Sequence, residues 1–409
     1  MAEIMAPAGS KEALHAAIKA GADSVYFGVG KLNMRASAAN FTLDNLEETV
    51  NYCKEKNVKT YLTVNIVMYD EDLEYMRTVI DKAKKVGVTA VICTDFAAIQ
   101  YANSIRQRVH LSTQANVSNL EAVKYYSQFA DAIVLARELR LEQIKNICNE
   151  IKKQQIKSPS GELVKIEAFI HGALCVSVSG KCYMSLATYN KSANRGSCLQ
   201  NCRRGYKVTD EETGDELVID NKYVMSPSDL CTIRILDRLV DSGVDIMKIE
   251  GRGRKPDYVY TVVKVYKEAV EAVEDNSYTK EKVESWEKEL AKVYNRGFWH
   301  NGYYLGEKIN EWSGEYGSKA TTEKSYTAKG INYYPKSKVA LFLVESGELK
   351  IGDKIAITGP TTGYIEHKIE TMIIEGEEAT TAKKGEEVTF PLECKVRHND
   401  KLFVIKKRN

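Results

Sequence analysis

The sequence predicts an α/β protein: a (β/α)8 barrel of the TIM type, with a cysteine-rich insertion after strand 7 and a small antiparallel β-barrel at the C-terminus. Short β-rich runs alternate with helical patterns eight times, which matches such a barrel in number and period. The segment after the seventh run is far longer than an ordinary βα loop. Beyond residue 325, only short β-rich runs between turn residues remain.

The first repeat sets the pattern for the elements that follow. An apolar run at 3–6 precedes Ser10, which can cap a helix over 10–20, and Gly21 ends that helix. The same criteria predict strands at 3–6, 24–29, 59–66, 89–94, 108–113, 132–136, 165–171 and 245–250. They predict helices at 10–20, 42–56, 71–86, 95–105, 119–129, 140–154, 226–242 and 256–274. A doubly wound open sheet is the alternative, but eight repeats without a glycine-rich first turn favour a closed barrel.

The chain therefore divides into a barrel domain at 1–305, a linker at 306–325 and a C-terminal β-domain at 326–409. Within the last of these, we expect strands at 339–344, 354–358, 371–374, 387–390 and 402–405. The insertion spans 173–225. Because βα loops lie on the face where barrels build their active sites, we expect it to roof the barrel mouth.

Composition excludes several classes of protein. With 58 Lys and Arg against 56 Asp and Glu, the formal net charge of +2 excludes bulk cationic binding of nucleic acid, although local basic patches are compatible with it. No apolar run reaches the ~18 residues of a membrane span, and the N-terminus has no secretory pattern. We expect a soluble, cytoplasmic protein that does not bind membranes; the oligomeric state stays open.

Cysteines are concentrated in the insertion. Cys175, Cys182, Cys198 and Cys202 supply four thiolates from two short loops, and such a set suits tetrahedral zinc or an iron–sulfur cluster. The six residues between the first two exceed the usual zinc spacing and mildly favour the cluster. The remaining cysteines are expected to be ordinary reduced thiols: Cys53, Cys93, Cys148, Cys394, and Cys231, which falls in a helical pattern and is expected to pack in the core.

Polar residues follow several predicted strands at their C-terminal ends, where a barrel places its chemistry. These are Asn65, Gln114, Arg137, His171 and Glu250, with Arg35 in the loop after the second strand. We expect Glu250, His171, Gln114 and Asn65 to be catalytic, with Glu250 or His171 moving protons. The alternative is that these side chains only hydrogen-bond one another.

Basic residues are local as well. Between 187 and 209 there are five and no acid: Lys191, Arg195, Arg203, Arg204 and Lys207. A second stretch at 248–255 carries four basic residues against Glu250. Beside the proposed metal site, these stretches would form a positive patch suited to RNA phosphates, and Tyr183, Tyr189 and Tyr206 could stack on bases. A solvated loop is the alternative interpretation.

Segment 167–185 (EAFIHGALCVSVSGKCYMS) resembles the signature of the U32 peptidase family. Four shorter matches keep that family's order: Pro7-Ala8-Gly9, Ser112-Thr113-Gln114-Ala115-Asn116, Leu135-Ala136-Arg137-Glu138 and Lys248-Ile249-Glu250-Gly251-Arg252. The family was named for collagenase-like proteases. Many members resemble oxygen-independent hydroxylases that use a [4Fe–4S] cluster and act on RNA or on ubiquinone precursors.

Within that family, the run from Cys198 to Arg203 (CLQNCR) is similar to the branch that makes 5-hydroxyuridine at the tRNA wobble position. The resemblance implies that Cys175, Cys182, Cys198 and Cys202 hold the cluster and that prephenate is a co-substrate. Arg137 and Arg252 could clamp such a dicarboxylate, since guanidinium groups pair bidentately with carboxylates. The other arginines expected to bind substrate are Arg35, Arg195, Arg203 and Arg204.

Other functions stay open. A U32-type peptidase is one, although no Gly-x-Ser-x-Gly or His-Glu-x-x-His motif occurs and only a Cys175/His171 pair is conceivable. A zinc-stabilised RNA-binding module is another, and hydroxylation of a small molecule a third. Residues 347–355 resemble the second domain of elongation factor Tu, a β-barrel associated with RNA-binding proteins.

Overall fold

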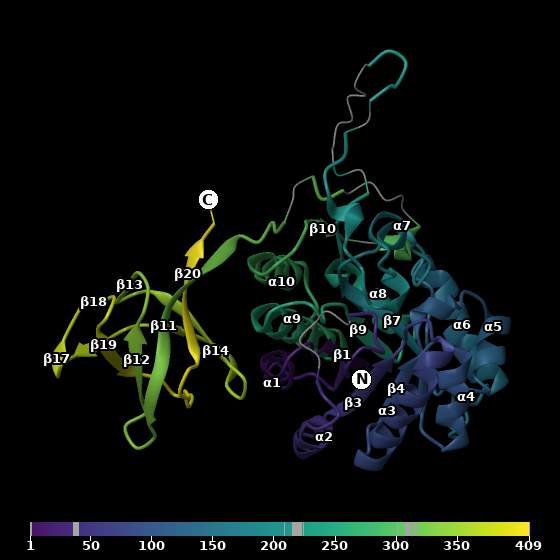
Figure 1. The fold of residues 1–409 in the computed structure, drawn as a ribbon, viewed down its shortest axis with the longest axis horizontal. Coiled ribbons are helices and arrows are strands. Elements are labelled where there is room, and N and C mark those ends of the chain that lie inside the picture. The colour runs from purple at the N-terminus through teal and green to yellow at the C-terminus, as the bar shows by residue number, and fades with distance from the viewer. Residues whose placement is uncertain are drawn as a thin grey trace.

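The structure is a computed structural model that describes residues 2–35, 41–207, 209–214, 223, 225–300, 302–306, 312–314 and 317–408. A barrel surrounded by helices fills one part of the molecule, and the C-terminal strands lie to one side of it (Figure 1). Parts of the predicted insertion (208, 215–222 and 224) and of the predicted linker (307–311 and 315–316) lie outside the described residues. Among those described, no helix is both long and apolar enough to cross a membrane.

Eight parallel strands close the barrel, which confirms the predicted fold class. They are β1 (Glu3–Pro7), β2 (Ser24–Gly28), β3 (Lys59–Val64), β4 (Ala90–Cys93), β5 (Val109–Leu111), β6 (Ala132–Val134), β7 (Lys165–Gly172) and β9 (Ile246–Ile249). Each of the first seven pairs with the next, and β9 pairs with both β7 and β1. Most strand residues are apolar and buried, as is usual for parallel strands covered by helices, and the exceptions include Glu167 and Lys248.

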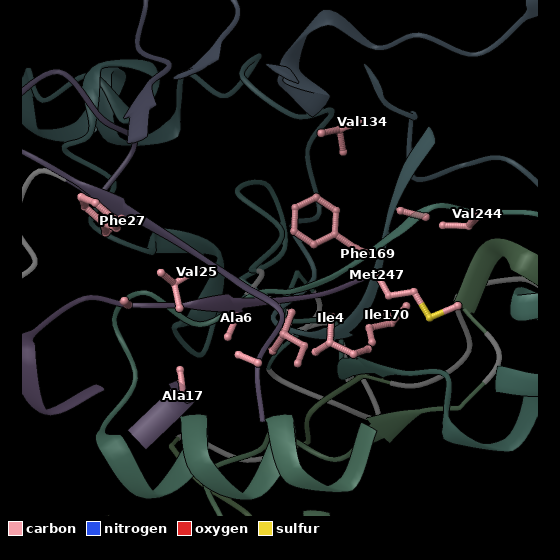
Figure 2. Packing of buried hydrophobic residues seen from close by; sticks show 14 of the residues in the cluster. Ile4, Ala6, Ala17, Val25, Phe27, Val134, Phe169, Ile170, Val244 and Met247 are labelled. Carbon is pink, nitrogen blue, oxygen red and sulfur yellow. The ribbon is translucent and has the colours of Figure 1, made fainter. Parts of the chain in front are cut away.

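Helices follow the strands in order and cover the barrel. They are α1 (Lys11–Lys19), α2 (Leu46–Glu55), α3 (Leu73–Val86), α4 (Phe96–Ser104), α5 (Leu120–Tyr126), α6 (Leu141–Gln154), α8 (Leu236–Asp241) and α9 (Pro256–Glu274). As expected, the Ser10 side chain accepts a hydrogen bond from the Ala13 amide and caps α1. Their apolar faces pack on the strands in one continuous core, part of which is drawn in Figure 2 around Ile4, Val25 and Ala17.

The predicted single helix over 226–242 is wrong. Residues Asp229–Cys231 form strand β8, which pairs antiparallel with the end of β7, and α8 begins only at Leu236. Strand β10 (Phe298–Trp299) then pairs with β8. Strand β7 extends past the barrel and offers free backbone groups there, and these recruit a three-residue strand that local periodicity does not reveal. Cys231 is therefore buried in a strand rather than in a helix. Helix α10 (Lys280–Lys292) is a further element that the sequence analysis missed.

The insertion runs between β7 and β8 and contains helix α7 (Met184–Tyr189) and two 3-10 turns, Ala193–Arg195 and Asn201–Arg203. Arg195 attaches it to the loop after β3, since its Nη1 donates to Asp72 Oδ2 at 2.6 Å and to the Val67 carbonyl at 2.8 Å. The insertion is thereby fixed to the barrel at a second place, apart from its own ends.

The C-terminal region is antiparallel, as predicted. One sheet holds β11 (Thr322–Tyr334), β12 (Val339–Val344), β14 (Lys354–Gly359), β15 (Gly363–Lys368), β16 (Ile373–Ile374), β17 (Glu377–Glu378), β19 (Glu387–Pro391) and β20 (Lys401–Lys407). A second sheet pairs β13 (Glu348–Lys350) with β18 (Thr381–Lys383). Strand β11 begins inside the segment expected to be a linker. Tyr364 of β15 packs on Ala16 of α1, and Lys324 pairs with Asp257 at 2.5 Å, so this region rests against the barrel.

A row of charged side chains crosses the barrel interior. Lys248 Nζ donates to Glu167 Oε1 at 2.7 Å, and Glu167 Oε2 lies 3.3 Å from His110 Nδ1. The Glu167 side chain is completely buried and that of Lys248 is 6% exposed. Burial alone would raise the pKa of Glu167, but the charge of Lys248 and the hydrogen bond from His110 lower it. The Glu167 carboxyl group is therefore held in its ionised form inside the barrel.

We predict that Glu167→Gln lowers the free energy of unfolding by about 3–5 kcal/mol, because it leaves the Lys248 ammonium buried without a counter-ion. The double variant Glu167→Gln/Lys248→Met should lose less than the sum of the two single variants. Urea unfolding measures both. Glu47→Gln, which breaks the exposed pair with Lys82 (3.4 Å), is the control and should cost less than about 1 kcal/mol. An equal loss in Glu167→Gln and Glu47→Gln would contradict the prediction.

Candidate functional site

A cavity of about 490 Å³ lies at the C-terminal ends of the barrel strands. Its floor is formed by residues on or just after the strands, among them Tyr26, Asn65 and Glu250, and insertion residues from Ala173 to Arg203 line it as well. The prediction that the insertion covers the barrel mouth is therefore consistent with the structure. This is the face on which TIM barrels build their active sites.

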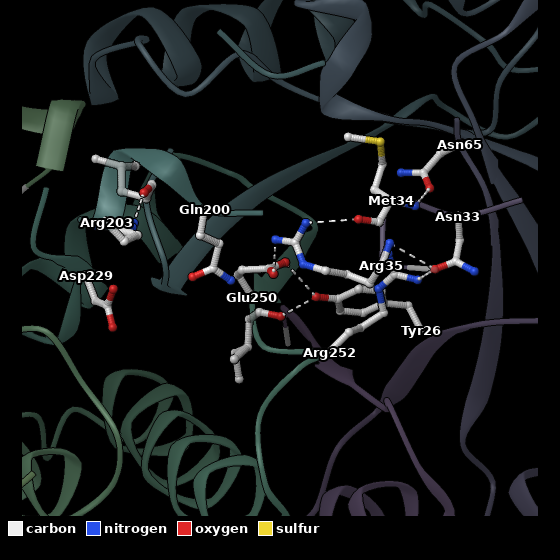
Figure 3. Close-up of polar contacts among 12 residues, drawn as sticks. Tyr26, Asn33, Met34, Arg35, Asn65, Gln200, Arg203, Asp229, Glu250 and Arg252 are labelled. Carbon is white, nitrogen blue, oxygen red and sulfur yellow. Dashed lines mark hydrogen bonds and ion pairs between the residues drawn. The ribbon is translucent and has the colours of Figure 1, made fainter. Parts of the chain in front are cut away.

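Glu250, directly after β9, is the one carboxylate among the described residues that line the cavity. Its Oε1 accepts a hydrogen bond from Arg35 Nη2 at 2.9 Å, and its Oε2 lies 3.2 Å from the Tyr26 hydroxyl (Figure 3). Burial would raise the pKa of Glu250, but Arg35, Arg252 and Arg137 lower it to about 2. At neutral pH this carboxylate is a weak proton acceptor, so the geometry suits charge positioning better than the predicted proton transfer.

Arg252 is buried at the edge of the cavity and already has partners. Its Nη1 donates to Asn33 Oδ1 at 2.9 Å and to Thr63 Oγ1 at 2.7 Å. A Cβ atom on Gly9 would lie 1.8 Å from the Arg252 carbonyl oxygen, so the turn after β1 requires glycine for this close approach. Arg252, which follows β9, thus contacts the loop after β2 and strand β3. Its Nη1 is already hydrogen-bonded within the protein.

Arg137, after β6, is less committed. Its guanidinium lies over the Phe169 ring at 4.3 Å, and its buried Nε has no hydrogen-bond partner in the part of the chain that the structure describes. An unpaired buried donor is costly, so this position is one where a ligand acceptor would be stabilised. Of the two arginines predicted to clamp a dicarboxylate, Arg137 is the one presented for binding.

Asn65 and Gln114, both expected at strand ends, lie side by side at the cavity. Asn65 Nδ2 donates to Gln114 Oε1 at 2.9 Å, and Gln114 Nε2 donates to the Asn65 carbonyl at 2.6 Å. Gly180 of the insertion has a φ of +71°, and a Cβ there would lie 2.8 Å from Gln114 Cγ. The absence of a side chain lets the first cysteine loop rest directly on this amide pair.

The four cysteines predicted to bind metal all line the cavity. They are exposed or half-exposed thiols, whereas Cys53, Cys93, Cys148 and Cys231 are buried in the core and Cys394 belongs to the C-terminal region. Burial raises the pKa of the Cys202 thiol, Arg203 opposes this, and the other three thiols raise it further, so Cys202 interacts electrostatically with each of them. A soft four-sulfur donor set fits zinc or an iron–sulfur cluster in its chemistry. No three His, Cys, Asp or Glu side chains among the described residues are placed to hold a metal ion, so the loops would have to draw the thiols closer.

His171 is not brought to the cavity. A register shift between Phe169 and His171 in the pairing of β7 with β9 interrupts the alternation of the strand, so Phe169 lines the cavity and His171 does not. His171 is buried beside Tyr258, Tyr266 and Phe298, and its Nδ1 lies 3.3 Å from the Tyr266 hydroxyl. Burial, with Arg254 and His300, lowers the pKa of His171 to about 3.

The remaining predicted arginines differ in position. Arg35 and Arg203 line the cavity, and the guanidinium of Arg203 bonds to the carbonyls of Leu174 and Pro227. Arg195 and Arg204 are not among the residues that line it. Arg195 pairs with Asp72, and Arg204 bonds to the Tyr189 hydroxyl.

Sequence reasoning missed several cavity residues. In the sequence, Lys248 and Arg254 stand out only as members of a basic stretch, and no motif points to Arg296. All three line the cavity. Arg296 pairs with Asp229 at 3.3 Å, a partner 67 residues away in the chain. Tyr26 and Phe169 resemble ordinary strand residues in the sequence. Only the closed barrel brings them together.

Comparisons with known proteins found a matching family and several relatives. A family model described as peptidase family U32 matches residues 9–314. A protein of Porphyromonas gingivalis named "Collagenase" is 54% identical over 99% of this chain and 98% of its own length. The "tRNA hydroxylation protein P1" of Bacillus subtilis is 30% identical over 96% of this chain and 92% of its own. The "23S rRNA 5-hydroxycytidine C2501 synthase" of Escherichia coli is 34% identical over 66% of this chain and 39% of its own.

The low pKa of His171 predicts a pH-dependent stability. Between about pH 6 and pH 4 an unfolded histidine binds a proton that the native His171 does not, so stability falls as the pH falls, by about 1.4 kcal/mol per pH unit. Urea unfolding of the wild type and of His171→Asn at several pH values measures this contribution as the difference in slope. Identical slopes in the two proteins would show that His171 titrates normally in the folded state.

Proposed function

The chain belongs to peptidase family U32, and from this premise we propose that it hydroxylates RNA, forming 5-hydroxyuridine at the tRNA wobble position with a [4Fe–4S] cluster and prephenate as co-substrate. Two relatives are named for tRNA hydroxylation and for synthesis of 5-hydroxycytidine in 23S rRNA, and one of them matches nearly the full chain. These names support an enzyme that hydroxylates RNA. The cluster, the co-substrate and the target nucleotide are the finer parts of the proposal.

One observation carries the proposal: four thiols and an excess of cations line the same cavity. The basic lining residues are Arg35, Arg137, Arg203, Lys248, Arg252, Arg254 and Arg296, against the single carboxylate of Glu250. A site of this charge favours anionic ligands, which include an RNA phosphate, a dicarboxylate and a cluster ligated by four thiolates. A peptidase that acts on neutral peptide bonds does not need this excess of positive charge.

Cys175, Cys182, Cys198 and Cys202 would hold the cluster. When bound, it would supply electron transfer, with a potential set by its surroundings. The chain's own contribution is electrostatic: burial raises the pKa of Cys202, the charge of Arg203 opposes that rise, and Arg35 lines the same cavity as the four thiols. Zinc in place of the cluster is the alternative that the donor set permits.

Arg137 is the arginine that would bind a carboxylate of the co-substrate. Its Nε lacks a partner among the described residues and the Phe169 ring fixes its plane, so a carboxylate could bind it bidentately. Glu250 is neutralised by Arg35 and therefore does not repel an incoming anion. Asn65 and Gln114 present amides to the same cavity and can orient a polar ligand.

A U32-type peptidase is the second candidate, because the 54% identical relative is named "Collagenase". The required nucleophile and base are Cys175 and His171. Cys175 lines the cavity, whereas His171 is buried outside it with a pKa of about 3. Because His171 does not line the cavity that holds Cys175, and its low pKa makes it a poor acceptor of the thiol proton, the arrangement favours hydroxylation.

The proposal predicts a nucleoside phenotype. Total tRNA from cells that lack the gene should lose 5-hydroxyuridine derivatives, and the wild-type gene should restore them. Cys175→Ser, Cys182→Ser, Cys198→Ser and Cys202→Ser should each fail to restore them, because each removes one proposed cluster ligand. Cys394→Ser, a half-buried thiol outside the cavity, is the control and should restore them. Nucleoside mass spectrometry is the measurement.

Purification under anaerobic conditions provides the second readout. The wild type should contain iron and sulfide, and each of the four variants should contain less. Zinc at one per chain with unchanged nucleosides would favour the zinc-stabilised RNA-binding module. If the nucleosides of tRNA were unchanged and those of ribosomal RNA were altered, the substrate would be ribosomal RNA and the proposed reaction, hydroxylation, would stand.

The peptidase candidate has its own test. We expect the purified protein not to cleave denatured collagen, with Cys175→Ala behaving as the wild type does. The readout is peptide release measured by mass spectrometry, with an inactive heat-treated sample as the control. Cleavage that disappears in Cys175→Ala and persists with a metal chelator would support the thiol peptidase instead.

A further inference from the structure

Large apolar side chains are exposed close together in sequence on the insertion, between residues 176 and 199. Six of them define what we call the insertion rim: Val176, Val178, Tyr183, Leu186, Tyr189 and Leu199, which are 37–69% exposed. Single exposed apolar residues are ordinary, whereas a concentrated group marks an interaction surface. Val176 and Val178 also line the cavity, so the rim borders its opening.

The rim continues onto the barrel. Val67 and Tyr69, in the loop after β3, are 41% and 52% exposed. Asn194 joins the two segments, because its carbonyl accepts from the Val67 amide at 3.1 Å and its Oδ1 accepts from the Cys182 amide at 3.3 Å. Tyr183 follows Cys182 directly. The exposed residues of the insertion and those of the barrel loop therefore belong to one surface beside the cavity.

The part of this surface that the insertion forms is positively charged. Residues 173–209 contain six lysines and arginines and no aspartate or glutamate. Two of the guanidinium groups lie over aromatic rings of the surface, Arg195 over Tyr69 at 3.8 Å and Arg204 over Tyr189 at 5.2 Å. Aromatic faces interleaved with cations are the features with which proteins bind single-stranded nucleic acid. The carboxylates nearest this surface, Asp70, Glu71 and Asp72, are confined to the barrel loop, where Asp72 pairs with Arg195, so the insertion itself offers no acidic group to an ordinary protein partner.

Tyr183 is the most exposed ring of this surface. Arg204 lies over one face of Tyr189, and Tyr206 is half-buried with its hydroxyl donating to the Asn201 carbonyl. Tyr183 is 69% exposed, and within the described part of the chain its side chain makes no hydrogen bond or ring contact. Its two chain neighbours, Cys182 and Met184, both line the cavity.

We infer that the insertion rim is the docking surface for a single-stranded loop of RNA, and that Tyr183 stacks on the nucleotide beside the one whose base enters the cavity. The inference rests on the proposed function and adds where on the chain the RNA is held. It also predicts a preference for looped over fully paired RNA, because only unpaired bases offer a face for stacking.

Binding of the purified full chain to a synthetic RNA stem-loop and to a blunt RNA duplex of equal length tests the inference. Tyr183→Ala should weaken stem-loop binding about tenfold or more, because the stacked ring is lost. Tyr183→Phe should keep wild-type affinity. Tyr334→Ala, which removes a 44% exposed tyrosine on β11, is the matched control and should change nothing. Lys191→Ala should reduce the salt dependence of binding by about one unit of slope, unlike Tyr183→Ala.

Cellular nucleosides separate this inference from the proposed function. If Tyr183→Ala keeps both wild-type stem-loop affinity and wild-type hydroxylation, the rim does not hold RNA, although the function stands. If the wild type forms no hydroxylated nucleoside, the function fails, whatever the binding data show. Equal affinity of the wild type for duplex and stem-loop would overturn the stacking role, and so would an equal loss in Tyr334→Ala.

Discussion

The buried ion pair between Lys248 and Glu167 is the constraint on which the site depends. Two charges inside a barrel are tolerated only when they face each other closely, so β7 and β9 must keep the register that places them at 2.7 Å. Side chains alternate along a strand, so the inward position of Lys248 fixes Glu250, two residues later, at the barrel mouth. The pair thereby determines where the acidic residue of the cavity lies, as well as holding two strands together.

From that fixed carboxylate the charges of the cavity follow. Arg35 reaches Glu250 from the loop after β2, and Arg252 joins the same loop through Asn33. Most cations of the site are thus anchored to the protein, whereas the buried Nε of Arg137 has no hydrogen-bond partner among the described residues. The insertion adds its thiols above this floor. A binding site with anchored cations around one such guanidinium keeps its shape before any ligand arrives, which lowers the entropic cost of binding.

Local periodicity was enough to predict most of the barrel, because each strand and helix carries its own pattern. It failed where an element depends on a distant partner: β8 has three residues and exists because β7 extends beyond the barrel to pair with it. Helix α10 could have been predicted from local sequence. Thr279 caps it, and its buried face has helical spacing, with Val283, Trp286 and Leu290. His171 stood correctly at the end of a strand, but the register shift beside it turned the side chain away. Arg296 could not be predicted as a cavity residue, because only the folded chain places it there. The four thiols could be predicted, because cysteine is rare and their spacing is local.

The antiparallel pairing of β7 with β8 also bears on how this protein can change over evolutionary time. The insertion leaves the barrel at Gly172 and returns through Leu230, and these two residues pair directly with each other. A loop whose ends are joined in this way can be lengthened, shortened or replaced at little cost to the scaffold beneath it. The insertion is also tied to the barrel through Arg195 and Asp72, so the segments of the insertion outside these two attachments are where its length can change while the barrel and its buried ion pair stay the same.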